Sequence, residues 1–332
     1  MKTKILDSTK ENIAFAAEVI RNGGLVAFPT ETVYGLGANA LDAEAVRKVY
    51  KAKGRPSDNP MICHIAEAEG MLDLTDTISD RVKRLMNEFC PGPITIIVPK
   101  KDGVPYVTSG RLDTVGVRMP DSDIARVLIK ASGVPIAAPS ANISGRPSPT
   151  RVEHVIEDMD GKVDVILRGP DCKIGIESTV IDTTGKNLMI LRPGMLTAGE
   201  ISLRMKEPVS YDPSLNKNPT DENFSPKAPG MKYRHYAPKA EMRIFEGSPD
   251  RVKAEIEREY VKAIAKGIKT GKILFEADAY DEAAHDFFAE LRRMDAEEVE
   301  LILCGGMKMS KDEGFAVMNR MLKSAGYNIV KV

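Results

Sequence analysis

The 332-residue chain is predicted to be an α/β protein with two domains, a larger one with a mixed sheet and a smaller one with a parallel sheet. Three observations predict this. Apolar runs typical of buried strands lie among stretches with helical spacing along the whole chain. Six prolines among polar residues at 206–240 predict an extended linker. After the linker, strands and helices alternate regularly. We therefore predict a first domain at 1–205 and a small Rossmann-like domain at 241–332.

The first domain is predicted to hold parallel and antiparallel strands, because its strands and helices do not alternate strictly. Gly35 and Gly37 are expected to form a tight turn that approaches a ligand. The predicted helices cover 11–22, 42–54, 79–89, 122–132 and 151–158, with Asp42, Ser79 and either Asp121 or Ser122 as N-caps. The predicted strands cover 25–28, 61–65, 94–98, 114–120, 134–138 and 163–167, and 178–181 forms a hairpin with 188–191.

The second domain is predicted as a doubly wound parallel sheet. Its strands are expected at 242–245, 272–275, 299–303 and 328–332, and its helices at 249–265, 280–294 and 314–325. Cys304-Gly-Gly306 is expected to be a tight turn. No set of residues with a catalytic pattern stands out in this domain. We therefore expect it to have a docking role or to support a lid, and not to catalyse a reaction of its own.

Composition excludes some classes of protein. The 47 basic and 48 acidic residues balance, which excludes nucleic-acid binding by bulk charge but leaves a local patch open. Cys63, Cys90, Cys172 and Cys304 lack metal-ligand spacing and are expected to be buried or free thiols in a reducing cytosol. No apolar segment approaches the ~20 residues of a membrane span, and the N-terminus lacks a signal-peptide core. We expect a cytoplasmic protein that contacts no membrane.

A basic loop follows the second helix. Lys51, Lys53 and Arg55 lie within five residues between glycine and proline breaks, which suits phosphate. A solvated helix end, with lysines near the last carbonyls, explains the loop about equally well. No phosphate loop of the GxxxxGK[ST] type, no GxGxxG and no HExxH occurs, so a bound phosphate group would have to be held by other residues.

Polar residues follow several predicted strands. Thr32, Arg118, Ser140 and Arg192 each stand at such a position, where α/β sheets bind ligands. Any one of them alone is more simply a turn residue. Together with the basic loop they favour a binding site at the edge of the first sheet.

Several longer motifs carry a family resemblance. The segments PTETVYGLG, KGRP, PSANISGRPSPT, ESTVID and LRPG resemble the YrdC-like threonylcarbamoyl-AMP synthases. APGMKYRHYAP at 228–238 resembles the linker of the long, two-domain form. The resemblance implies a YrdC-like twisted mixed sheet as catalytic domain, with the linker closing the active site. It also implies the reaction of L-threonine, bicarbonate and ATP to L-threonylcarbamoyladenylate and pyrophosphate, for the threonylcarbamoyladenosine modification of tRNA.

The resemblance also implies roles for individual residues. Lys53 and Arg55 are the expected catalytic pair. The residues expected at ATP are Arg55, Asn59, Thr114, Ser140, Asn142, Ser148, Arg192, Tyr233, His235 and Tyr236. Those expected at L-threonine are Thr32, His64, Arg118, Ala138 and Ser178. Mg²⁺ is expected on the triphosphate, and the sequence shows no dedicated carboxylate cage for it. Glu31 and Glu177 are the acids near the motifs, and a structural role explains each of them equally well. The tRNA threonylcarbamoyl transferase machinery is the expected downstream partner.

Two other classes of protein remain open from the sequence. An RNA-binding or ribosome-maturation protein would use a basic groove and make weak RNA contacts without adenylate synthesis. A carbamoyl-transfer module would share the fold. That family usually carries acylphosphatase and zinc-finger parts, which this chain lacks.

Overall fold

The computed structural model describes residues 2–216, 236–308 and 312–332. The chain divides into two compact units, residues 1–144 with 148–232 and residues 145–147 with 233–332. The predicted domain boundaries at 205 and 240 stay predictions. Among the described residues no helix is long and apolar enough to cross a membrane.

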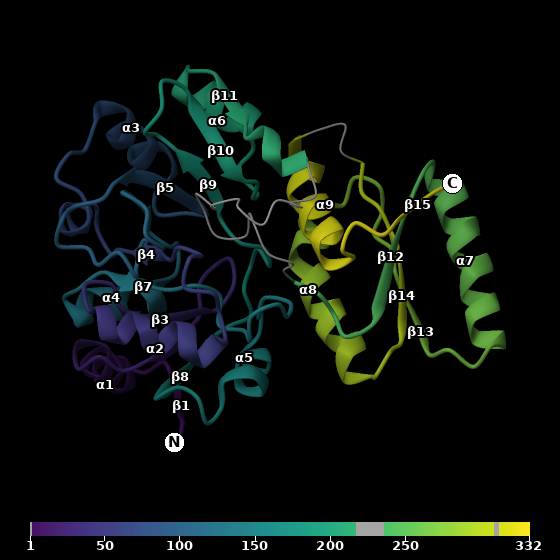
Figure 1. Cartoon of the computed structure of the whole chain (residues 1–332), viewed down its shortest axis with the longest axis horizontal. Coiled ribbons are helices and arrows are strands. Elements are labelled where there is room, and N and C mark those ends of the chain that lie inside the picture. Colours follow the sequence, from purple (N-terminus) through teal and green to yellow (C-terminus); the bar gives the residue numbers. More distant parts are fainter. Residues whose placement is uncertain (1, 217–235, 309–311) are drawn as a thin grey trace. The chain divides into compact units, whose positions relative to one another are not determined.

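The first unit is built on a twisted sheet with parallel and antiparallel strands, as predicted (Figure 1). The strands it describes join in the order β1-β8-β2-β3-β7-β4-β6-β5-β9-β10-β11. Their bounds are β1 (Lys4–Asp7), β2 (Val26–Phe28), β3 (Gly35–Asn39), β4 (Ile62–His64), β5 (Ile94–Pro99), β6 (Thr114–Arg118), β7 (Ile136–Ala137), β8 (Val165–Arg168), β9 (Thr179–Asp182), β10 (Leu188–Arg192) and β11 (Val209–Tyr211). The predicted hairpin is confirmed, because β9 and β10 pair antiparallel.

Helices cover this sheet through two apolar clusters. α1 (Lys10–Arg21) and α4 (Asp123–Ser132) bury their apolar sides against β2 and β8 in one cluster. The second cluster takes in apolar residues of α2 (Ala43–Lys53), α3 (Asp80–Phe89), α5 (Val152–Met159) and α6 (Ala198–Met205). The short 3-10 helices are η1 (Ala68–Asp73) and η2 (Pro213–Asn216).

Side chains cap these helices where the sequence predicts it. Asp42 and Ser79 accept hydrogen bonds from the first backbone amides of α2 and α3. Of the two candidates before α4, Ser122 is the cap. The left-handed Gly54 ends α2, so Lys51 and Lys53 of the predicted basic loop belong to the last turn of this helix, and only Arg55 follows it.

The predicted tight turn at Gly35 and Gly37 is wrong, because both glycines belong to β3. They are needed there for packing. A Cβ atom on Gly37 would lie 2.6 Å from Cγ2 of Ile136 and 2.8 Å from Cε1 of Phe28. Glycine therefore leaves room for the Phe28 ring against the next strand. The segment Gly35–Asn39 lacks the β-branched residues that indicate a strand.

The predicted linker begins with regular structure. Its residues Val209–Tyr211 form β11, which pairs parallel with β10. Residues 217–235, with the predicted site residues Tyr233 and His235, lie outside the described residues.

The second unit is a parallel sheet in the order β13-β14-β12-β15, as predicted. Its strands are β12 (Glu241–Glu246), β13 (Thr270–Ile273), β14 (Leu301–Gly305) and β15 (Ile329–Lys331). In Figure 1, α7 (Pro249–Ala265) lies on one side of these strands, and α8 (Tyr280–Ala296) and α9 (Asp312–Ser324) lie on the other. The tight turn predicted at Cys304 is wrong, since Cys304 and Gly305 continue β14. Strand β13 also starts two residues before its predicted position at Lys272.

Candidate active site

One face of the first sheet gathers most of the predicted threonine residues. β4 and β6 run parallel with His64 opposite Arg118, and β5 pairs antiparallel with β6. Because side chains alternate along a strand, Gly116 and Arg118 share a face. A Cβ on Gly116 would lie 3.1 Å from Cγ2 of Thr95, so Thr95 of β5 lies on that same face.

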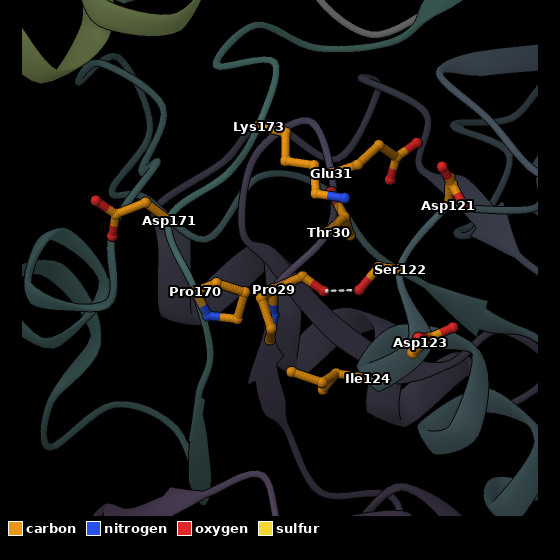
Figure 2. A pocket seen from close by; sticks show the side chains of 10 residues that line it. All are labelled: Pro29, Thr30, Glu31, Asp121, Ser122, Asp123, Ile124, Pro170, Asp171 and Lys173. Carbon is orange, nitrogen blue, oxygen red and sulfur yellow. Dashed lines mark hydrogen bonds between the residues drawn. The ribbon is translucent and has the colours of Figure 1, made fainter.

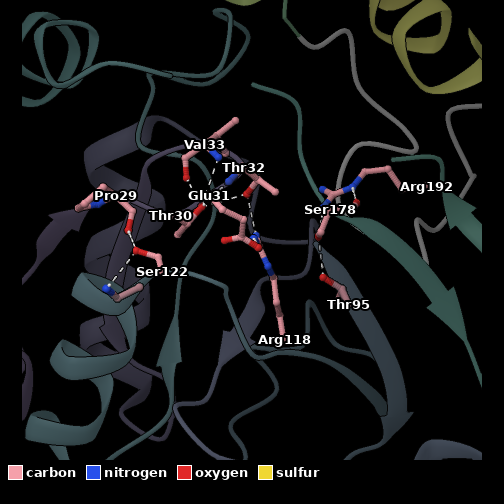
Figure 3. Close-up of polar contacts among 11 residues, drawn as sticks. Pro29, Thr30, Glu31, Thr32, Val33, Thr95, Arg118, Ser122, Ser178 and Arg192 are labelled. Atoms are coloured by element: carbon pink, nitrogen blue, oxygen red, sulfur yellow. Dashed lines mark hydrogen bonds and ion pairs between the residues drawn. The ribbon is translucent and has the colours of Figure 1, made fainter. Parts of the chain in front are cut away.

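Arg118 is neutralised by a residue of the PTET motif (Figure 3). Its Nη2 donates to Oε1 of Glu31 at 2.5 Å, and its Nη1 donates to Oγ1 of Thr32 at 2.9 Å. Both charged side chains are 5% exposed. Glu31 therefore has a defined role as the counter-charge of Arg118. Among the described residues, Glu31 Oε2 and Arg118 Nε still have no hydrogen-bond partner.

The donor and acceptor roles of the two threonine hydroxyl groups beside Arg118 are fixed by their contacts. Thr30 Oγ1 donates to the carbonyl of Val33 at 2.6 Å, so it has no proton left for Thr32. Thr32 must then donate across the 3.0 Å contact to Thr30. Since Thr32 also accepts from Arg118, its hydroxyl keeps one acceptor position. A ligand at Thr32 must supply a hydrogen.

His64 is a neutral imidazole in this site. Burial lowers its pKa most, the positive charges of Arg118 and Arg192 add to this effect, and together they bring the pKa to about 3. Its ring meets Phe28 edge-on with ring centres 6.2 Å apart. In the described part of the chain, Nδ1 of His64 has no hydrogen-bond partner. His64 can therefore offer a ligand a neutral donor or acceptor.

Ser178 and Arg192 are joined directly, although they were predicted for different substrates. Arg192 Nε donates to the Ser178 carbonyl and Nη2 donates to the Ser178 hydroxyl, both at 3.0 Å. The Ser178 hydroxyl also lies 2.8 Å from Oγ1 of Thr95 (Figure 3). Thr95 was not predicted as a site residue. Its only signal in the sequence is a hydroxyl inside an otherwise apolar strand.

Lys53 joins two of the sequence motifs. Its ammonium is buried and donates to the backbone carbonyls of Ser140 and Asn142. The Ser140 hydroxyl in turn donates to Oδ1 of Asn142 at 2.5 Å. Lys53 thus holds the loop that carries the predicted Ser-x-Asn pair. The alternative interpretation of a solvated helix end fits Lys51, which is exposed. It does not fit Lys53, which is buried.

The remaining predicted site residues of the first unit lie on loops or, for Thr114, at the start of β6. Arg55 Nη2 donates to the carbonyl of Pro60 at 3.0 Å. Asn59 is buried and, within the described residues, its Oδ1 has no partner. Ser148 donates to Oε1 of Glu177 at 2.5 Å, which gives Glu177 a structural contact. Ala138 donates to the carbonyl of Ile62 at 2.9 Å, and Thr114 begins β6.

Tyr236 belongs to the second unit. Its ring packs against Phe288 of α8 with centres 5.0 Å apart, and Arg320 of α9 lies over its face at 5.8 Å. The side chain is 6% exposed. Its predicted contact with ATP stays a prediction.

A pocket of about 320 Å³ lies beside the same PTET loop (Figure 2). Its wall carries the carboxylates of Glu31, Asp121, Asp123 and Asp171 against the single cation Lys173. This balance repels a triphosphate. The lining of this pocket therefore does not suit a triphosphate.

The described residues provide neither a metal cage nor an activated thiol. No group of three or more His, Cys, Asp or Glu side chains in 2–216, 236–308 and 312–332 is placed to hold a metal ion. All four cysteines are free, as predicted. Burial raises the pKa of Cys63 to about 12, so its thiol stays protonated at neutral pH.

The chain matches two sequence families that divide it near residue 195. Residues 18–194 match the Sua5–YciO–YrdC family, described as Telomere recombination. Residues 197–326 match the family described as Threonylcarbamoyl-AMP synthase, C-terminal domain. The chain is also 48% identical to the threonylcarbamoyl-AMP synthase of Pyrococcus abyssi, over 96% of each sequence. The chain belongs to the threonylcarbamoyl-AMP synthase family.

Other members of the threonylcarbamoyl-AMP synthase family match the whole chain. The Bacillus subtilis enzyme is 42% identical over 100% of both sequences. The crystal structure of P. abyssi Sua5 complexed with L-threonine superposes with a TM-score of 0.94 at 46% identity, covering 99% of this chain and 100% of that one. Membership in the threonylcarbamoyl-AMP synthase family and the two-part fold are thus confirmed.

Proposed function

We propose that the chain is a threonylcarbamoyl-AMP synthase that makes L-threonylcarbamoyladenylate and pyrophosphate from L-threonine, bicarbonate and ATP. Full-length relatives with this name support the activity. The alternative of an RNA-binding or ribosome-maturation protein without adenylate synthesis has no comparable support. A weak RNA contact beside the enzymatic activity remains compatible with the balanced charge.

One structural observation carries the proposal. Buried polar atoms without a partner gather around Arg118 and His64, among the described residues: Glu31 Oε2, His64 Nδ1 and Arg118 Nε. Unsatisfied buried polar groups cost roughly 1–3 kcal/mol each, so proteins keep them mainly where a ligand completes the bonds. A small molecule with several donors and acceptors, such as an amino acid, fits this demand. L-threonine is proposed at Thr32, His64, Arg118, Ala138 and Ser178.

The proposed reaction needs no covalent enzyme intermediate. The threonine amine attacks bicarbonate carbon and, with loss of water, gives a carbamate. A carbamate oxygen then attacks the α-phosphorus of ATP, and the bond to pyrophosphate breaks. Negative charge grows on the phosphoryl oxygens and on the leaving group. The buried Arg192, the half-buried Arg55 and the Lys53 ammonium are fixed before reaction, so they can stabilise this charge without reorganising.

The nucleotide is proposed on the loops around these cations. Arg55, Asn59, Thr114, Ser140, Asn142, Ser148 and Arg192 would hold ATP from the first unit. Tyr233, His235 and Tyr236 stay proposed contacts from the linker. Mg²⁺ would be held mainly by triphosphate oxygens and water, which suits its usual coordination. The buried and free cysteines support action in a reducing cytoplasm.

Pyrophosphate release tests the proposal. The purified chain is mixed with ATP, Mg²⁺ and bicarbonate, with threonine, serine or no amino acid. We expect release that needs both threonine and bicarbonate and is much weaker with serine. Equal release with serine, or none with threonine, would contradict the substrate assignment. The product would supply the transferase that modifies tRNA.

A further inference from the structure

We propose that Thr95 is a positioning residue that fixes the Ser178 hydroxyl as a hydrogen donor to an acceptor oxygen of the amino-acid substrate. The inference rests on the proposed function. It concerns a residue that no motif of the family resemblance includes. Its basis is the number of hydrogens and lone pairs that three buried side chains can share.

The Ser178 hydroxyl has one proton and two acceptor positions. Arg192 can only donate, so its Nη2 occupies one acceptor position at 3.0 Å. Among the described residues, the other contact of the hydroxyl is with Thr95 Oγ1 at 2.8 Å, where either oxygen could donate. The direction of that bond therefore decides whether Ser178 keeps its proton for a ligand.

The environment of Thr95 settles the direction. Thr95 is fully buried, and Ser178 is its hydrogen-bond partner in the part of the chain that the structure describes. If Ser178 donated, the Thr95 proton would be buried without an acceptor, which is costly in a dry interior. If Thr95 donates, its proton is satisfied by the Ser178 oxygen. Both acceptor positions of Ser178 are then filled, and only its proton remains.

Ser178 is thereby restricted to donating. Oxygens that accept include those of a carboxylate, a carbamate and a phosphate, whereas an ammonium or protonated amine is rejected. Thr32 on the same sheet face has the opposite restriction, because Arg118 and Thr30 leave it only an acceptor position. A bound amino acid would then place an oxygen at Ser178 and an N–H or O–H group at Thr32. Thr95 thus helps to set the orientation of the substrate.

Strand pairing places Thr95 next to Ser178. β5 pairs parallel with β9 with Ile94 opposite Thr179 and Thr95 opposite Val180, so Thr95 lies next to the start of β9. Gly116 on the other neighbouring strand leaves room for its methyl group. A serine would keep the hydroxyl at this position, and a valine would keep the shape without the hydroxyl.

The test measures equilibrium binding of L-threonine to wild type, Thr95→Val, Thr95→Ser and Ser178→Ala, and to the Thr95→Val/Ser178→Ala double variant. Pyrophosphate release is measured alongside. We expect Thr95→Val to weaken threonine binding about 5- to 12-fold, which is the upper part of the range for one neutral hydrogen bond. Thr95→Ser should stay within about threefold of wild type. Thr3→Val, which removes another buried hydroxyl, should leave threonine binding unchanged.

The double variant separates positioning from a structural effect. If Thr95 acts through Ser178, Thr95→Val adds nothing to Ser178→Ala. Additive losses would overturn the proposal, as would unchanged or tighter binding by Thr95→Val. If wild type releases pyrophosphate with threonine but Thr95→Val binds normally, only this inference fails. If wild type neither binds threonine nor releases pyrophosphate, both the inference about Thr95 and the proposed function fail.

Discussion

Glu31 and Arg118 form an ion pair of 2.5 Å in which both side chains are 5% exposed. The pair spans the PTET loop and β6, so it fixes the loop that carries Thr32 to the strand next to His64. Each partner still has one unsatisfied polar atom among the described residues. The pair is thus both a structural bond and part of the surface offered to a ligand.

Removing the charge of Glu31 should destabilise the fold. In Glu31→Gln the Arg118 guanidinium stays buried without its counter-charge, which should lower the free energy of unfolding by about 3 kcal/mol. Urea unfolding measures this change. Glu44→Gln, which breaks the exposed pair with Arg47, is the control and should change little. Equal stabilities of the two variants would show that Arg118 does not depend on Glu31.

His64 should make stability depend on pH. Its pKa is about 3 in the folded chain and near 6.5 when unfolded, so between these values the unfolded chain binds the extra proton. Stability should therefore fall as pH drops below about 6.5, by up to roughly 1.4 kcal/mol per pH unit from this residue. Unfolding of wild type and His64→Gln from pH 5 to 8 isolates the effect. Parallel curves for the two proteins would refute a neutral, buried His64.

Arg55 should matter for turnover and little for folding. Its half-buried guanidinium donates to the Pro60 carbonyl at 3.0 Å and to the Asn59 carbonyl at 3.4 Å, and these bonds hold it in the loop where we propose the phosphates bind. Arg55→Ala should reduce kcat/KM for ATP by about 100-fold or more, since a fixed charge at the transition state is lost. Arg47→Ala on the exposed side of α2 is the matched control. A wild-type rate for Arg55→Ala would remove the residue from the site.

Gly194 should tolerate no side chain. A Cβ there would lie 2.4 Å from the Thr179 nitrogen and 2.8 Å from the Ser178 carbonyl carbon. Gly194→Ala should therefore move Ser178 away from Arg192, with a loss of activity and about 1–3 kcal/mol of stability. Gly185→Ala in the same hairpin has its nearest neighbour at 3.7 Å and should be neutral. An active, fully stable Gly194→Ala would contradict the tight fit.

The sequence predicted the fold largely because its signals are local. N-caps at Asp42, Ser79 and Ser122 and the alternating second domain follow from short-range patterns. β3 was not predicted as a strand because its glycines are typical of turns. Their role is to make room for Phe28, a contact that forms only in the folded chain. The site was predicted through motifs that place polar residues after strands. Its internal bonds could not be predicted, because Thr95 meets Ser178 across 83 residues and Lys53 meets Asn142 across 89.

Transfer of labelled carbon tests the central claim most directly. The chain is incubated with [¹³C]bicarbonate, ATP, Mg²⁺ and L-threonine, and the nucleotide products are analysed by mass spectrometry. We predict an adenylate that contains threonine and one ¹³C atom, formed in equal amount to pyrophosphate. AMP or ADP without the labelled threonyl group, while ATP is consumed, would contradict the proposed synthesis.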